Sequence, residues 1–205
     1  MRIRRHQRNV GEAIRYGRQR LSEDRHQECL EFLEEARKKY PNAAEIQLLY
    51  ATVLLESRPD DVTAEVIRAV ELAAEDPVIL VRAASLMFGR GEYQVARSYV
   101  ERARSVVGPG FVLEGGLVNL EGSFAAFDGA YDLAETKFRS AVELDPSFES
   151  FARDLARLLQ VRGRQAEAVE VIDRALPQVE NKRDLERLRE KILGGAAPPS
   201  SRRHT

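Results

Sequence analysis

The stretch that decides the fold is residues 115–146, which read GGLVNLEGSFAAFDGAYDLAETKFRSAVELDP. A series of mostly small residues runs through it at spacings that fit two consecutive helices joined by a turn. Successive offsets of 7, 5, 4, 3 and 5 residues separate its members, which are Gly122, Gly129, Ala134, Phe138, Ala141 and Pro146. The stretch therefore predicts a helical hairpin that ends before the proline.

The same series recurs along the chain. Five of its positions return 34 residues later, as Ala156, Gly163, Ala168, Ile172 and Ala175. They also occur 38 residues earlier, as Ala84, Gly91, Ala96, Val100 and Ala103. Shorter matches precede these, namely Val62, Val66 and Ala69, and then Cys29, Leu33 and Ala36. The sequence therefore predicts five copies, with about four residues inserted near residues 108–110 before the fourth copy.

A 34-residue unit with small residues where two helices cross, and a proline after the second helix, resembles the tetratricopeptide repeat. The resemblance covers about residues 10–180. It implies an all-α fold, an α-solenoid of about five helix pairs that forms a right-handed superhelix. The second copy departs from the pattern, because Tyr50 stands where a small residue is usual. Its register is therefore the least well defined of the five.

The expected domain organisation has three parts. Residues 1–8 form a basic, disordered arm, residues 9–193 the repeat domain, and residues 194–205 a disordered tail rich in Gly, Pro and Ser. Residues 181–193 form a capping helix, because Leu185, Leu188 and Ile192 share one helical face. Asn9 and Ser147 stand where side chains that cap helix starts are expected.

Composition bears on the class of partner and the compartment. The 205 residues include 32% charged residues but carry a net charge of −1, so no overall field attracts nucleic acid or an anionic membrane. No apolar run reaches the roughly 18 residues of a membrane span, and membrane insertion is not expected. A single cysteine, Cys29, rules out an intrachain disulfide and fits a reducing, cytoplasmic location.

The sequence offers no constellation of catalytic residues. There is no phosphate-binding glycine loop followed by lysine, and the three histidines, His6, His26 and His204, lack metal-site spacing. Cys29 takes a position that alanine fills in three other copies, which favours a small buried residue over a nucleophile. We therefore predict no enzyme activity, no cofactor and no metal site.

The resemblance implies that the first helix of each pair lines a concave groove that holds a partner. The candidate groove residues are Ile14, Arg15, Arg18, Gln47, Leu54, Val81, Arg82, Ser85, Phe88, Asn119, Ser123, Arg153 and Arg157. Arginines at both ends suit carboxylates or phosphates, and the Asn and Ser side chains suit the backbone of an extended peptide. The alternative is a set of solvated or mutually paired side chains, with Asp154 near Arg153.

Three functions follow as hypotheses. The first is a scaffold, adaptor or co-chaperone that captures an extended or helical segment of another protein, an acidic segment being one option. The second is a self-assembling scaffold, a homo-oligomer in which the first copy packs against another chain. The third, RNA binding by a helical repeat surface, is disfavoured by the near-zero net charge.

Overall fold

The computed structural model describes residues 2–108 and 110–195, with side chains described from Asn9 to Gly194. In these ranges the chain forms eleven α-helices and one short 3-10 helix, with no strand. The predicted all-α class is confirmed. The helices divide into two compact units, unit 1 up to residue 109 and unit 2 from residue 110. The boundary falls in the loop where the sequence predicts an insertion.

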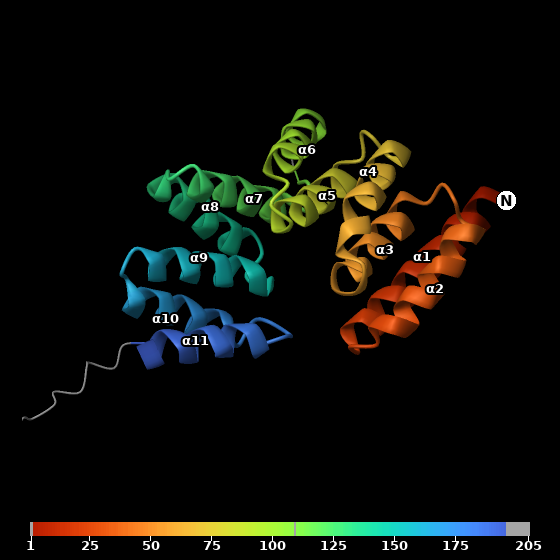
Figure 1. Ribbon diagram of the computed structural model, residues 1–205. Coiled ribbons are helices and arrows are strands. Elements are labelled where there is room, and N and C mark those ends of the chain that lie inside the picture. The colour runs from red at the N-terminus through yellow and green to blue at the C-terminus, as the bar shows by residue number, and fades with distance from the viewer. Residues whose placement is uncertain (1, 109, 196–205) are drawn as a thin grey trace, which may run out of the picture. The chain divides into compact units, whose positions relative to one another are not determined.

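Unit 1 is a stack of three helix pairs (Figure 1). They are α1 (Arg2–Ser22) with α2 (His26–Lys39), α3 (Ala44–Ser57) with α4 (Val62–Leu72), and α5 (Pro77–Gly89) with α6 (Tyr93–Val106). The 3-10 helix η1 (Pro59–Asp61) precedes α4. The first helix of each later pair also packs on both helices of the pair before it, α3 on α1 and α2, and α5 on α3 and α4.

Unit 2 holds two further pairs and an end helix. The pairs are α7 (Glu114–Phe127) with α8 (Tyr131–Leu144), and α9 (Glu149–Val161) with α10 (Gln165–Ala175). The end helix α11 (Arg183–Gly195) packs on α9 and α10, where the first helix of another pair would lie. It buries Leu185, Leu188 and Ile192. Five pairs and a capping helix are therefore confirmed, while the right-handed course of the whole stack stays a prediction.

The small-residue positions mark the closest helix crossings. The alanine shared by all five copies is buried in each one, as Ala36, Ala69, Ala103, Ala141 and Ala175. A Cβ atom added to Gly122 would lie 2.8 Å from two ring atoms of Phe138. Gly17, the counterpart of Gly122 in the first copy, shows the same closeness, since its Cβ would lie 2.9 Å from Leu49 Cδ2. These contacts hold the helices at a separation that only glycine permits without movement.

The turns inside the pairs follow the predicted glycines. Gly91, Gly129 and Gly163 all have a positive φ of 76–81°, a conformation that glycine adopts without steric cost. Asp24 takes a similar conformation, φ 61°, in the first pair. The second pair turns through η1 instead, yet Val62, Val66 and Ala69 are fully buried. The register predicted for the second copy is therefore correct.

Three local predictions at helix starts are wrong. The backbone of α1 is helical from Arg2, so residues 2–8 are not a separate arm and Asn9 lies inside the helix. Ser147 is no cap either, because its hydroxyl donates to Asp145 Oδ1 at 2.6 Å and α9 starts at Glu149. The physical reason at α1 is that the helix continues through these residues, and at α9 the N-cap position falls on Phe148, which makes no side-chain cap.

Three further features concern the start of α5, the C-terminal residues and the length of the apolar helices. Asp76 does cap a helix, accepting from the amides of Val78 at 2.8 Å and Ile79 at 3.3 Å. Of the predicted tail, residues 194 and 195 end α11, and residues 196–205 lie outside the described residues. No described helix combines the length and the apolar character needed to cross a membrane.

Candidate functional site

The predicted groove residues fall into two classes by burial. Five are buried, namely Ile14, Gln47, Leu54, Val81 and Asn119. The others are at least partly exposed, namely Arg15, Arg18, Arg82, Ser85, Phe88, Ser123, Arg153 and Arg157. Placing Ile14, Leu54 and Val81 on a binding surface is therefore wrong, because these apolar side chains pack between helices of unit 1.

Gln47 belongs to a structural network, which also corrects its predicted role. Its Oε1 accepts from Arg37 Nε at 2.9 Å, and its Nε2 donates to Glu65. Arg37 also donates to both carboxylate oxygens of Glu65, at 2.9 and 3.0 Å, and stacks over the Tyr50 ring, 3.9 Å from its centroid. The network ties α2, α3 and α4 together. It also explains why the second copy has a tyrosine at a position that is usually small.

Two arginines of unit 1 act on each other without an acidic partner in contact. Burial lowers the pKa of Arg82, and the positive charge of Arg18 lowers it further, while Glu45 and Asp76 oppose this to a smaller extent. Neither Arg18 nor Arg82 makes a hydrogen bond or ion pair with any residue that the structure describes, and the same holds for Arg15. The first helices α1 and α5 thus present three arginines that no described residue pairs by a hydrogen bond or an ion pair.

Ser85 and Phe88 extend this surface along α5. Ser85 is exposed and lies one turn after Arg82, and Phe88 is half-buried against Tyr93, with 5.2 Å between the ring centroids. We call Arg15, Arg18, Arg82, Ser85 and Phe88 the arginine face of unit 1. It offers guanidinium donors, one hydroxyl and one ring edge.

The corresponding residues of unit 2 are paired among themselves. Arg153 Nε lies 3.4 Å from Asp154 Oδ1, and Arg153 Nη1 lies 3.8 Å from Glu149 Oε1. Asn119 Nδ2 donates to Asp154 Oδ2 at 2.9 Å, and Asn119 Oδ1 is buried without a donor. Among the candidate groove residues of unit 2, Arg157 alone is exposed and makes no hydrogen bond or ion pair with a described residue. For Arg153 the alternative of a mutually paired set is correct.

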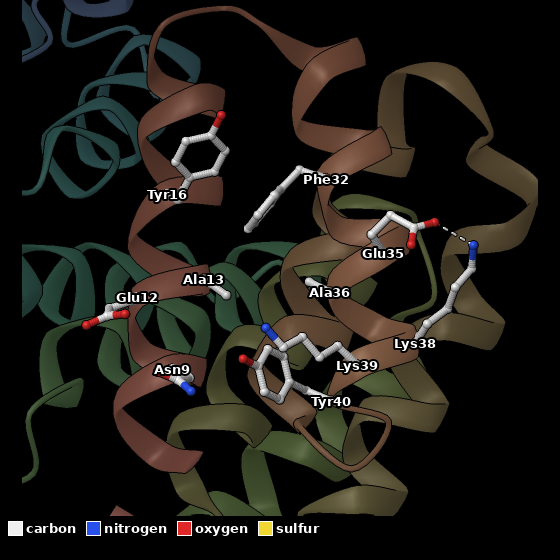
Figure 2. Close-up of a pocket in the computed structure, with 10 residues that line it drawn as sticks. All are labelled: Asn9, Glu12, Ala13, Tyr16, Phe32, Glu35, Ala36, Lys38, Lys39 and Tyr40. Atoms are coloured by element: carbon white, nitrogen blue, oxygen red, sulfur yellow. Dashed lines mark hydrogen bonds and ion pairs between the residues drawn. The ribbon is translucent and has the colours of Figure 1, made fainter. Parts of the chain in front are cut away.

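Sequence reasoning missed a groove on another side of unit 1, between α1 and α2. It measures about 780 Å³, and its apolar lining is Ala13, Tyr16, Phe32, Ala36 and Tyr40. Figure 2 shows Tyr16 and Phe32 facing each other across the two helices, with 4.5 Å between their ring centroids. The signal that could have revealed it is an aromatic residue at position 16, where the four later copies carry Leu49, Ala83, Glu121 and Leu155.

The features that bear on reactive chemistry are the possible metal ligands and the single cysteine. No group of three or more His, Cys, Asp or Glu side chains there lies close enough to hold a metal ion. Cys29 is buried, its thiol donates to the Gly17 carbonyl oxygen at 3.2 Å, and burial raises the pKa of that thiol. A raised pKa disfavours the thiolate, which is the reactive form of cysteine.

Comparison with known proteins identifies the fold. No family model matches the chain, and no curated protein sequence matches it. Solved structures do match. TTC0263, a thermophilic tetratricopeptide-repeat protein of Thermus thermophilus, is 22% identical with a TM-score of 0.73, over 90% of this chain and 98% of that one.

Two further structures show the same likeness. PilW, a type IV pilus biogenesis factor, is 18% identical with a TM-score of 0.68, over 91% of this chain and 87% of its own. A chain of the APC/C hetero-tetramer Cut9–Hcn1 is 14% identical with a TM-score of 0.72, over 92% of this chain and 37% of its own. At such identities the likeness concerns architecture, and the chain has the tetratricopeptide-repeat fold.

Proposed function

We propose that this chain is a protein-interaction scaffold or adaptor whose arginine face binds an acidic, extended segment of a partner protein. The fold supports the general part of the proposal, because stacked helix pairs build extended surfaces that bind other proteins. PilW and the Cut9–Hcn1 chain, which share the fold, are described as a biogenesis factor and as a member of a hetero-tetramer. The proposal assigns the chain no catalytic step.

The observation that carries the proposal is the neighbouring pair Arg18 and Arg82, neither of which forms an ion pair with a described residue. Placing two guanidinium groups near each other, one of them half-buried, costs free energy that an ion pair within the chain would normally offset. The described residues provide no such ion pair. A carboxylate from a partner would supply charge-assisted hydrogen bonds at this place.

The surroundings favour a peptide over other anions. The Ser85 hydroxyl can pair with a backbone group one turn from Arg82, and the partly exposed Phe88 ring can cover an apolar side chain. The chain's net charge of −1 gives no general attraction for nucleic acid. A cytoplasmic location is part of the proposal, supported by the single, buried Cys29.

A quantitative affinity capture from the source cells tests the proposal. The full chain is compared with Arg18→Glu/Arg82→Glu, and with a control, Arg68→Glu/Arg187→Glu, which reverses two exposed arginines on α4 and α11. We expect at least a tenfold loss of the captured partner for the first variant and less than a twofold change for the control. Equal capture by all three proteins would contradict the proposal, and so would equal loss for both variants.

A further inference from the structure

A buried amide of unit 2 has an acceptor atom that no donor reaches. Asn119 on α7 is only 8% exposed, and its Nδ2 donates to Asp154 Oδ2 on α9 at 2.9 Å. This bond fixes which way the amide faces. Its Oδ1 atom is left buried and accepts no hydrogen bond from any described residue. A buried carbonyl oxygen without a donor costs free energy, so a donor from outside the chain would stabilise this place.

A second buried oxygen without a hydrogen bond lies close by, on the first turn of α9. It is Glu149 Oε1, whose contact with Arg153 Nη1, at 3.8 Å, is too long for a hydrogen bond. The other end of the same guanidinium, Arg153 Nε, lies 3.4 Å from Asp154 Oδ1. Asn119, Asp154, Arg153 and Glu149 therefore form one continuous cluster, and what the cluster lacks is donors.

A third carboxylate, Asp184 at the start of α11, belongs to the same place. Burial raises the pKa of Glu149, and the charges of Asp184 and Asp154 raise it further, while Arg153 and Arg157 only partly offset this. The helix α9 packs on both α7 and α11, so all of these residues lie within unit 2. We call Asn119, Glu149, Asp154 and Asp184 the acceptor cluster.

Unit 1 contains a complete version of the amide and carboxylate arrangement. Gln47, the counterpart of Asn119 by repeat spacing, is also buried and donates to the carboxylate of Glu65. Its Oε1, however, accepts from Arg37, which also donates to that carboxylate. One guanidinium satisfies both groups because its donors form a rigid planar fork. Among the described residues, Asn119 and Asp154 lack a guanidinium that reaches the amide oxygen.

Arg153 is the group that a ligand would displace. It contacts both carboxylates of α9, but at 3.4 and 3.8 Å, whereas charge-assisted hydrogen bonds are ordinarily about 2.7–2.9 Å long. Its side chain is 26% exposed and can therefore move toward solvent. A guanidinium that enters at a better angle would gain shorter bonds to the same oxygens.

We propose that the acceptor cluster binds an arginine side chain of a partner protein. The incoming guanidinium displaces Arg153 and donates to Asn119 Oδ1 and to the Asp154 carboxylate, while Glu149 supplies further negative charge. This site goes beyond the acidic segment proposed for the arginine face, because it lies in the other unit and selects the opposite charge. Either site can exist without the other.

The test is a titration of the ¹⁵N-labelled full chain with two short glycine–serine peptides, capped at both ends so that one central side chain carries the only charge. The central residue is arginine in one peptide and citrulline, its neutral isostere, in the other. The readout is the side-chain amide signal of Asn119, identified by its loss in Asn119→Ala. We expect a saturating shift with the arginine peptide and roughly fivefold weaker binding of the citrulline twin.

The decisive variant is Arg153→Gln, because it removes the competing guanidinium. We expect it to bind the arginine peptide about threefold more tightly, whereas Asp154→Asn should bind it about fivefold more weakly. Matched controls come from the exposed ion pair on α10, Glu170 with Arg174. Arg174→Gln and Glu170→Gln make the same chemical changes and should each alter binding less than about twofold.

Three results would overturn the proposal. They are an Asn119 amide signal that the arginine peptide does not move, equal binding of the citrulline twin, and weaker binding by Arg153→Gln. The last result would mean that Arg153 itself holds the ligand, as in a site for anions. If Asp154→Asn does not fold, Arg153→Gln still decides, since its side chain is partly exposed.

Discussion

The first helix pairs of the two units, α1 with α2 and α7 with α8, are built from equivalent residues and differ mainly on one side. Both place a glycine against a large side chain at the crossing, Gly17 against Leu33 and Gly122 against Phe138. On the side that faces away from the following pair, unit 1 has two aromatic rings and unit 2 an ion pair. The crossing therefore reflects what the fold requires, and the outer side can differ without changing the crossing.

The largest expected effect is at the alanine shared by both pairs. Ala141 is fully buried, and Ala141→Leu should destabilise unit 2 by about 1–3 kcal/mol through overpacking. Its counterpart Ala36 lines the open groove, so Ala36→Leu should cost less than about 1 kcal/mol because the longer side chain can extend into free space. Chemical denaturation followed by circular dichroism measures both. Equal losses would show that the groove is not open at Ala36.

The next largest effect on stability is expected at Gly122 and Gly17, the glycines at the two helix crossings. In Gly122→Ala the new methyl group would meet the rigid Phe138 ring at 2.8 Å, which overpacks the crossing. The gain in helix propensity offsets only part of this, and we expect a net loss of about 1–2 kcal/mol. In Gly17→Ala the nearest atom is the movable end of Leu49, so the net change should stay within about 0.5 kcal/mol. Thermal melting of both variants checks this order.

The sequence predicts the repeat architecture well because helix crossings constrain residue size. Five copies, the glycine turns and the end helix all follow from spacing, and the register of Val62 and Val66 holds although Tyr50 breaks the pattern. The burial of individual residues could not be predicted equally well from the sequence. Leu54 and Phe88 are equivalent by spacing, yet the first is fully buried and the second is accessible, because packing of neighbouring helices decides exposure.

The groove was not predictable from any single stretch of sequence. Tyr16 and Phe32 look like ordinary core aromatics until the structure shows that, in the part of the chain it describes, the groove they line is open. The self-pairing of Arg153 was likewise foreseen only as an alternative, since spacing does not reveal which side chains turn toward each other. The predicted start of the first helix is wrong for a local reason, because α1 continues through the residues that resemble a cap.

Acid should destabilise the helix pair α7 with α8 more than the pair α1 with α2. Glu135 on α8 accepts from Arg139 at 2.8 Å, from Arg162 at 2.9 Å and from Arg164, and its counterpart in unit 1 is Leu30. Burial raises the pKa of Glu135, but the hydrogen bonds from Arg139 and Arg164 outweigh this and lower it overall. A lowered pKa in the folded state stabilises unit 2 above the ordinary carboxyl pKa, near 4.5, and this contribution is lost as pH falls below it.

Glu135→Gln measures that contribution. We expect it to cost about 1 kcal/mol at pH 7, and the difference from the wild type to shrink as pH falls below about 4.5. Urea denaturation at several pH values gives both numbers, with Glu143→Gln on the exposed side of α8 as the control. A constant difference between pH 7 and pH 3.5 would mean that the charge of Glu135 contributes nothing.

The final prediction tests the central claim, that the fold does not require the two aromatic rings on the outer side of the first pair. The unfolding free energy of Tyr16→Glu/Phe32→Lys is the most direct measurement. We predict a value within about 1 kcal/mol of the wild type, because the new pair copies Glu121 and Lys137 and leaves the crossing at Gly17 intact. A loss of more than about 3 kcal/mol would show that the two rings belong to the core, and would contradict the claim.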